Sequence, residues 1–587
     1  MKIKRLKISN WRSIKSLEID GQDLMVIIGQ NNHGKSNLLS AVLFFFGEIK
    51  SHELDFNYGS TELFVEITFS DLDANDKLTF RKYVTSANQI VVRKTAYISG
   101  NFEYKGYIEN PTDEWLQESN ASAYTKREVA ESLPFYSFLP NSGRITKQHI
   151  IDAQLSYIEQ HRQEITFEYQ QEETNFLGLK TVAKGIFGEV YFIPAVKEAT
   201  DDFTSKETSA FGRLYADVIA VMSETNSEWK DTRNRLSKLF ETLNRLDSEG
   251  RPNENRPTQL SEFETELSGE LSLWGAQIDI EVSPPDIESV FKANTQVWVN
   301  DGVRTDICRK GHGLQRALTV ALIQVLAKRA QQEPTFEQQP QASRQASKSR
   351  YFIFEEPELY LHPQAQRSLF DNFVKLSESG NQVILCTHSS GLIDVEKYKS
   401  IYIVTKDSEE IGTTIKHCKE DLFTGDGKKD FNLSYWINPD RGELFFAAKA
   451  ILVEGATDKT IIPLLAKNLG IFKYDYTVID CGSKSSIPLY ARLLNRFSIP
   501  YVAVYDRDHQ SHKNADAIAS ADVTTNQIEN EINTDLGVSV VFENDIEEEL
   551  GLAAGNKNKP YIALTHVSDL AYQIPDALES KLRLIYE

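Results

Sequence analysis

Three acidic residues in the C-terminal part of the chain have the types and spacing of a metal site. Glu454 follows the apolar run 450–453, and Asp506 and Asp508 follow the apolar run 501–505. Carboxylate oxygens are the ligands that hard divalent cations prefer. We therefore expect Glu454, Asp506 and Asp508 to bind a divalent metal ion, an arrangement that serves several kinds of phosphate chemistry.

The elements around these acids must bring them together. Residues 450–453, 476–482 and 501–505 are predicted to be strands, with helices at 457–469 and 487–497 between them. This alternation is typical of a small parallel sheet, whose strands end at one common edge. Catalytic groups in such sheets gather at that edge. The three acids should therefore converge from two strands.

A second chemical motif lies near the N-terminus. The run Gly29-Gln30-Asn31-Asn32-His33-Gly34-Lys35-Ser36 fits the phosphate loop G-x-x-x-x-G-K-S, between an apolar strand and a helix predicted to start near residue 37. Backbone N–H groups of this loop, including those of Gly29, Asn31, Asn32 and Gly34, would surround the phosphates. Lys35 should reach the β and γ phosphates, and Ser36 should ligate Mg²⁺. The sequence therefore predicts ATP binding.

Two later strands end in residues suited to ATP hydrolysis. The apolar strand 351–354 ends in Glu355 and Glu356. We expect Glu355 to hold Mg²⁺ through water and Glu356 to polarise the attacking water, as phosphoryl transfer requires. His388 follows the predicted strand 382–386 and is a candidate contact of the γ-phosphate.

The order of these motifs resembles the ABC-type ATPase heads of the SMC and RecF-like DNA-repair proteins. Between phosphate loop and acidic strand stands a glycine-rich segment before a helix, with Gly311, Gly313 and Gln315 as candidate phosphate contacts. In such heads this glycine-rich segment is called the signature, and the signature of one subunit covers the ATP held by the other. The resemblance therefore implies a head-to-tail homodimer or higher homo-oligomer. Two departures are the roughly 275 residues between phosphate loop and signature, and Glu355 where the family more often has Asp.

The C-terminal acids resemble those of the Toprim domain of topoisomerases, primases and some nucleases. Glu454 and the Asp506-x-Asp508 pair are 52 residues apart. Together with the ABC-type head, nearly the whole chain except its insert resembles the OLD (overcoming lysogenization defect) family of nucleases. The resemblance implies DNA as the substrate and a role in anti-phage defence. It is also compatible with a dedicated partner protein, such as a helicase or a reverse transcriptase with its DNA product.

The same resemblance extends the candidate site. Asp458 corresponds to a further acid of the family, usually Glu, and the cluster 545–549 should supply another ligand, for which we favour Glu547. Lys559 is a candidate basic group near the scissile phosphate. Five carboxylates suffice for two ions, Mg²⁺ or Mn²⁺, that activate water and stabilise the leaving oxygen.

These motifs predict an ATP-binding and ATP-hydrolysing, metal-dependent DNA endonuclease whose nucleotide acts as a conformational gate. Two alternatives stay open: a Toprim topoisomerase or primase-like enzyme, and an ATP-gated DNA-binding repair scaffold without nuclease activity. A primase normally adds a zinc module, which the four scattered cysteines do not provide. No dedicated domain for a topoisomerase tyrosine is evident.

Composition limits the class of protein. The 587 residues carry a net charge of −21, which counts against a protein that coats DNA but not against a local basic groove. No apolar run reaches the roughly 20 residues that span a bilayer, and we find no signal peptide. We expect a cytoplasmic protein without a membrane partner.

The predicted fold is α/β: an ABC-type P-loop ATPase domain with a largely helical insertion, followed by a C-terminal Toprim domain with a Rossmann-like β-α-β pattern. We expect the ATPase domain at 1–200 and 281–430, a helical and dimerising insertion at 201–280, and the Toprim domain at 431–587. Within the insertion, 209–246 has heptad-like leucine spacing. A projecting helical arm and an ordinary packed subdomain both explain that spacing.

Overall fold

The structure is a computed structural model, and its two compact units are described separately. It describes residues 1–179, 184–195, 226–246, 255–271, 278–282, 297–311, 347–406, 410–422, 439–510, 514–552, 559–569 and 571–587, with pieces of one to three residues between some of these ranges. The first unit comprises Met1–Val190, Pro334–Glu358 and Gln366–Glu587, and the second Tyr191–Glu333 and Leu359–Ala365. None of the helices described is long and apolar enough to cross a membrane.

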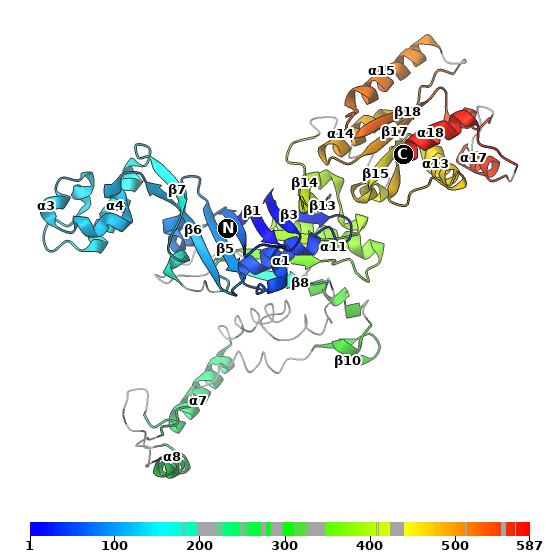
Figure 1. Cartoon of the computed structure of the whole chain (residues 1–587). Coiled ribbons are helices and arrows are strands. Elements are labelled where there is room, and N and C mark those ends of the chain that lie inside the picture. The colour runs from blue at the N-terminus through cyan, green and yellow to red at the C-terminus, as the bar shows by residue number, and fades with distance from the viewer. Residues whose placement is uncertain are drawn as a thin grey trace. The chain divides into compact units, whose positions relative to one another are not determined.

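A six-stranded, mostly parallel sheet forms the centre of the ATPase domain (Figure 1). Its order is β14 (Thr413–His417), β13 (Ile401–Lys406), β3 (Leu24–Ile28), β12 (Gln382–Cys386), β11 (Arg350–Glu355) and β8 (Glu189–Ile193). Strand β3 is parallel to both β12 and β13, and β11 is parallel to β12. Their near-continuous apolar runs are those of strands buried on both faces. The segments after β3, β11 and β12 therefore leave the sheet at one edge.

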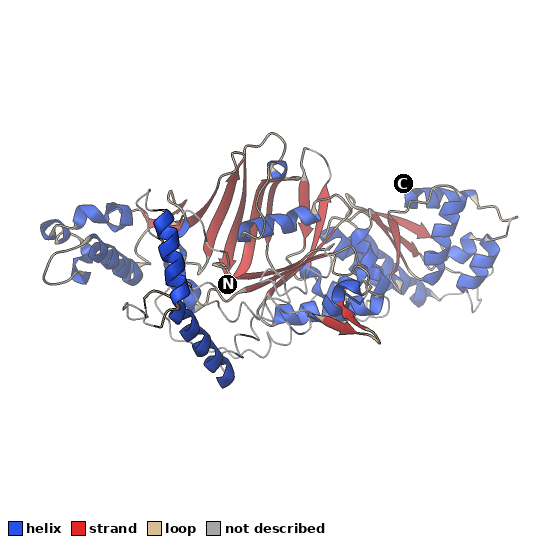
Figure 2. Cartoon of the chain, turned by 90° about the horizontal axis from the view of Figure 1, so that it is seen from below, coloured by secondary structure: helices blue, strands red, loops and turns tan. Residues whose placement is uncertain are grey.

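An antiparallel sheet covers the helix that follows the phosphate loop (Figure 2). Its order is β2 (Ile14–Asp20), β1 (Lys2–Trp11), β4 (Glu62–Ser70), β5 (Ile90–Tyr97), β6 (Phe102–Pro111) and β7 (Phe167–Gln171). Burial alternates along β4 and β5, as in a sheet with one face on a core. That face meets α1 (Lys35–Phe46) through aromatic rings, with Phe45 and Phe69 centroids 5.9 Å apart.

Two smaller helical parts accompany this sheet. Helix α2 (Ala74–Thr79) follows β4. Between β6 and β7 the chain leaves the sheet to form α3 (Arg127–Ala130) and α4 (Lys147–His161) around a separate apolar cluster that includes Phe135 and Ile150. This excursion therefore has a small core of its own.

The C-terminal domain is a four-stranded parallel sheet with the predicted β-α-β-α-β order. The strands are β16 (Tyr476–Asp480), β15 (Lys449–Val453), β17 (Tyr501–Asp506) and β18 (Gly537–Phe542), in that order and all parallel. The helices are α13 (Ala456–Asn468), α14 (Ile487–Arg496), α15 (Ala515–Glu531), α16 (Ile546–Glu549), α17 (Lys559–Val567) and α18 (Asp576–Tyr586). The predicted strand 476–482 ends early, because the chain turns at Gly482 with a φ of 82°.

The described part of the second unit contains the helices α7 (Ser227–Leu243) and α8 (Thr258–Glu270) and the short hairpin β9 (Trp298–Asn300) and β10 (Arg304–Asp306). No residue of α7 is buried, which fits a projecting arm better than a packed subdomain. Most of 209–225 lies outside the described residues.

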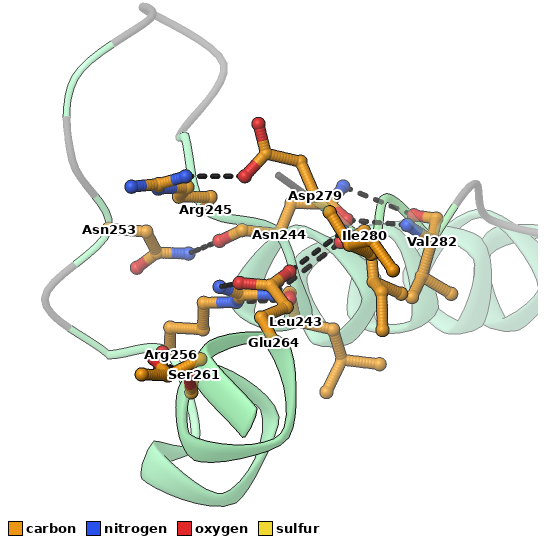
Figure 3. A network of polar contacts seen from close by, with 12 residues as sticks. Leu243, Asn244, Arg245, Asn253, Arg256, Ser261, Glu264, Asp279, Ile280 and Val282 are labelled. Atoms are coloured by element: carbon orange, nitrogen blue, oxygen red, sulfur yellow. Dashed lines mark hydrogen bonds and ion pairs between the residues drawn. The ribbon is translucent and has the colours of Figure 1, made fainter. Parts of the chain in front are cut away.

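A polar clasp holds α7 and α8 together (Figure 3). Arg256 and Glu264 form a paired ion bridge, with Nη1 to Oε2 2.7 Å and Nη2 to Oε1 2.5 Å. Glu264 also accepts the backbone N–H of Ile280 at 2.7 Å. Asn244 exchanges two hydrogen bonds with the backbone of Val282, at 3.1 and 2.6 Å. This clasp fixes the segment 278–282 against both helices.

Candidate functional site

The phosphate loop leaves β3 in a conformation that requires glycine. Gly29 has a φ of 145°, and a Cβ there would lie 2.3 Å from the carbonyl oxygen of Val404. Gly34 has a φ of 107°, and a Cβ there would lie 2.5 Å from Oγ1 of Thr413. The loop therefore passes close to β13 and β14. Asn31, Asn32 and Ser36 are exposed on it.

The ammonium of Lys35 is buried within its own loop. It donates to the carbonyl oxygens of Gly29 at 2.9 Å and Gln30 at 2.8 Å. Burial lowers the pKa of Lys35, while the nearby charges of Glu356 and Glu358 act to raise it. The structure thus places the phosphate-loop lysine beside the acidic turn that follows β11.

Glu355, Glu356 and His388 lie at the ends of neighbouring strands. Glu355 ends β11, and the backbone N–H of Glu356 donates to the carbonyl of Cys386 at 2.8 Å. Nε2 of His388 lies 3.6 Å from Oε1 of Glu356. Burial lowers the pKa of His388, and the positive charge of Lys35 lowers it further. These groups therefore form one site with the phosphate loop.

The glycine-rich segment is only partly described. Gly311 is exposed, whereas Gly313 lies outside the described residues. Gln315 is buried, and its Nε2 donates to the carbonyl oxygens of Ile307 and Lys310, both at 3.0 Å. The amide nitrogen of Gln315 therefore holds the turn that precedes its helix. Gly311 and Gln315 belong to the second compact unit.

The predicted acids of the C-terminal domain gather at one edge of its sheet. Glu454 follows β15, and its Oε1 accepts the backbone N–H of Asp506, the last residue of β17, at 2.7 Å. Asp508 lies two residues beyond, with a φ of 67°. Asp458 and Glu547 are buried in the first turns of α13 and α16.

Burial and mutual repulsion raise the pKa of two of these carboxyls. Burial raises the pKa of Asp506 to about 9, and the charges of Glu454, Asp458, Asp508 and Asp545 act in the same direction. Burial likewise raises the pKa of Asp458 to about 7, with contributions from Glu454 and Glu547. So many acids around one point repel each other unless cations join them. The donor set therefore suits divalent cations.

The ligand geometry itself is not formed. Across the described ranges, no three His, Cys, Asp or Glu side chains meet in an arrangement that could hold a metal ion. The acids are gathered by the sheet edge, while the side-chain positions needed for coordination are not adopted. The acid cluster therefore suits a metal ion through its negative charge and its oxygen donors.

Two lysines lie against this acid cluster. The buried ammonium of Lys484 donates to the carbonyl oxygen of Asp506 at 2.5 Å and lies 3.8 Å from Oδ2 of Asp508. Nζ of Lys559 lies 3.6 Å from Oδ2 of Asp545 and 3.4 Å from Oε1 of Glu547. Lys559 therefore stands beside two acids of the cluster.

Three further residues of the two candidate sites were not predicted from the sequence. Lys484 comes two residues after Gly482, at the end of the second predicted strand of the C-terminal domain. Asp545 was in the acidic cluster but was not chosen. Glu358 is the third acid of Glu355-Glu356-Pro357-Glu358, and its contact with the turn at His388 is visible only in the structure.

Comparisons with known proteins agree with this architecture. Residues 1–393 match the AAA ATPase domain family, and residues 445–508 match the family described as "Overcoming lysogenization defect protein-like, TOPRIM domain". The chain is 25% identical over 542 residues to the Old nuclease of Escherichia phage P2, covering 87% of this chain and 78% of that protein.

Two further relatives match over shorter stretches. The OLD nuclease of Thermus scotoductus is 30% identical over 243 residues, which cover 38% of this chain and 45% of that protein. Endonuclease GajA of Bacillus cereus is 26% identical over 219 residues, which cover 32% of this chain and 31% of that protein.

Proposed function

The chain belongs to the OLD family of nucleases, with an AAA-type ATPase domain followed by a Toprim domain, and on that premise we propose that it cleaves DNA with divalent metal ions under the control of ATP. The α/β fold predicted from the sequence, an ATPase followed by a Toprim domain, is confirmed. The observation that carries the proposal is the convergence of six carboxylates and two lysines at one edge of the Toprim sheet.

We assign the metal ligands as Glu454, Asp458, Asp506, Asp508 and Glu547. Bound Mg²⁺ or Mn²⁺, as a pair, would activate a water molecule and stabilise the attacking and leaving oxygens of a phosphodiester. Lys484 holds the turn that carries Asp506 and Asp508. We assign Lys559 as a group that contacts the scissile phosphate, since its ammonium is at the same edge and about half exposed.

ATP would bind at the phosphate loop of the first domain. We assign phosphate contacts to Gly29, Asn31, Asn32, Gly34 and Lys35, and a metal contact to Ser36. Glu355 would hold Mg²⁺ through water, Glu356 would orient the attacking water, and His388 would contact the γ-phosphate. Glu356 and His388 are close enough to act on the same phosphate.

ATP control requires a second copy of the chain. We propose a homodimer in which Gly311, Gly313 and Gln315 of one copy cover the nucleotide of the other, with the insertion 201–280 between the ATPase parts 1–200 and 281–430. Nucleotide binding would then change how the two Toprim domains, 431–587, meet DNA. We also propose a role in defence against phage, which a plaque assay with and without the gene product tests.

A plasmid cleavage assay tests the central proposal. Purified protein is incubated with supercoiled plasmid and Mg²⁺ or Mn²⁺, with and without ATP. Nicked and linear products are expected from the wild type, and Asp506→Ala should abolish them while ATP binding persists. Asp535→Ala, which removes an exposed acid from the same domain, is the matched control.

The other outcomes identify the alternatives. Relaxed closed circles would indicate a topoisomerase, and unchanged plasmid with intact DNA binding would indicate a scaffold. Cleavage that persists in Asp506→Ala would refute the assignment of the metal site.

A further inference from the structure

We propose that Glu358 is a positioning residue of the ATPase site, which ties the turn after β11 to the turn after β12 and so sets Glu356 against His388. The assignment rests on the proposed ATPase function and adds a residue to that site. Glu358 is not expected to touch the nucleotide. It acts through Glu356, which would orient the attacking water, and His388, which would contact the γ-phosphate.

The contacts of Glu358 all reach the neighbouring strand end. Its side chain is buried, with 8% of the residue exposed. Its Oε1 accepts the hydroxyl of Thr387 and the backbone N–H of His388, both at 2.7 Å. Hydrogen bonds to a charged acceptor are stronger than neutral ones. One carboxylate oxygen therefore fixes the two residues that begin the histidine turn.

The turn held by Glu358 is also tied to the phosphate loop. The backbone N–H of Thr387 donates to the carbonyl of Ile27 at 3.0 Å, two residues before the loop begins at Gly29. The hydroxyl oxygen of Thr387 accepts the backbone N–H of Ser389 at 2.9 Å. Thr387 is fully buried between these partners. The histidine turn is thus positioned by β3 on one side and by Glu358 on the other.

The backbone conformation of Glu356 explains why the turn after β11 is held against the turn after β12. Its φ is 45°, a left-handed conformation that is costly for a residue with a side chain. Strained backbone of this kind persists only where its surroundings hold it in place. The backbone N–H of Glu356 is bonded to Cys386, and two residues later Glu358 is bonded to Thr387 and His388. The strained residue is therefore held against β12 from both sides.

The second carboxylate oxygen argues against a role in packing alone. Oε2 of Glu358 is buried and has no hydrogen-bond partner within the part of the chain that the structure describes. A glutamine or an apolar residue would avoid placing this charge in the interior. The charge of Glu358 acts on Lys35 and on His388, the two basic groups of the site. Glu358 therefore contributes to the site through its charge as well as through the hydrogen bonds that position the histidine turn.

Two variants separate these contributions. Glu358→Ala removes both hydrogen bonds, whereas Glu358→Gln keeps an oxygen that can accept them and removes the charge. Glu378→Ala, an exposed acid of the same domain, is the control. The kcat and KM of ATP hydrolysis, the Kd of a fluorescent ATP analogue and the thermal midpoint are measured for each.

The expected result is a loss of turnover without a loss of binding. Misplacing a catalytic group by about 1 Å costs on the order of 100-fold in rate, so Glu358→Ala should lower kcat by about 10- to 100-fold and change Kd by less than about threefold. Glu358→Gln should recover at least about one third of the lost kcat. In a His388→Ala background, Glu358→Ala should have little further effect, because residues that act through one another are not additive.

Three results would overturn the assignment. A folded Glu358→Ala with wild-type kcat would do so, as would a parallel fall of kcat, ATP binding and thermal midpoint that Glu358→Gln does not rescue. Full additivity with His388→Ala would also contradict it. A wild type that binds ATP without hydrolysing it would remove the proposed ATPase function and this role together, whereas the first three results leave the ATPase function standing.

Discussion

Replacing Lys484 by methionine should separate DNA cleavage from ATP hydrolysis. The ammonium of Lys484 is buried at the edge of the Toprim sheet, where it donates to the carbonyl oxygen of Asp506 and lies 3.8 Å from Oδ2 of Asp508. Methionine keeps a side chain of similar length and removes the charge and the donor. Asp506 then loses a hydrogen bond, and Asp508 loses the ammonium 3.8 Å away.

The size of the effect follows from these distances. Two unit charges 3.8 Å apart attract by about 4 kcal/mol at an effective dielectric constant near 20. Desolvation of an ammonium whose side chain is 9% exposed offsets part of this attraction. A hydrogen bond to a charged group has a net value of about 1.5–3 kcal/mol. If that free energy positions the two aspartates for reaction, cleavage should fall by about 10- to 150-fold.

The predicted fall in cleavage is measured from initial rates of plasmid nicking over a range of Mg²⁺ concentrations. ATP hydrolysis should stay at its wild-type rate, since the ATPase site lies in the other domain of the chain. Lys467→Met removes an exposed lysine of the same domain and is the control. Cleavage within about twofold of the wild type at every Mg²⁺ concentration would refute the positioning role of Lys484.

Three further results are expected. Lys35→Ala should weaken ATP binding at least about tenfold, measured with a fluorescent ATP analogue, because the β and γ phosphates lose their lysine; unchanged affinity would contradict the phosphate-loop assignment. Burial lowers the pKa of Lys94 to about 7, so between about pH 7 and 10 the unfolded chain binds one more proton than the folded chain. The free energy of unfolding of the ATPase domain should therefore rise with pH in this range, by about 1.4 kcal/mol per pH unit more in the wild type than in Lys94→Met. Equal slopes in denaturant titrations would show that Lys94 stays charged. The ion pair with Arg256 lowers the pKa of Glu264 to about 2, so the clasp between α7 and α8 should persist at pH 4.5 and open as the pH falls toward 2. In Glu264→Gln, hydrogen exchange of residues 278–282 should already be faster than in the wild type at pH 7. Equal protection of this segment in the two proteins would refute the clasp.

Most of the residues found from sequence share one property: each lies in the segment that follows an apolar strand. Lys35, Glu356 and His388 follow β3, β11 and β12, and Glu454 and Asp506 end or follow β15 and β17. Parallel strands end at a common edge, so residues after such runs meet in space even when they are distant in the chain. Their convergence was therefore predictable without knowing the order of the strands.

The residues that were missed depend on neighbours from other strand ends. Lys484 is identified by its bond to Asp506, 22 positions away, and Glu358 by its bonds to Thr387 and His388. Nothing in the local pattern distinguishes a lysine or glutamate that turns toward such a partner from one that faces water. Glu547 and Asp545 show the same limit, since the acidic run alone did not indicate that both lie beside Lys559.

The sequence alone determined the two chemistries, because a phosphate loop and an acid set are defined by residue types at fixed spacing after buried strands. The tertiary structure decided which strands are neighbours: β3 lies between β12 and β13, and β15 lies between β16 and β17. Strand order depends on how distant apolar faces are buried together, and local periodicity carries no record of it. That order brings Glu358 to the histidine turn and Lys484 to the paired aspartates, and so completes both sites.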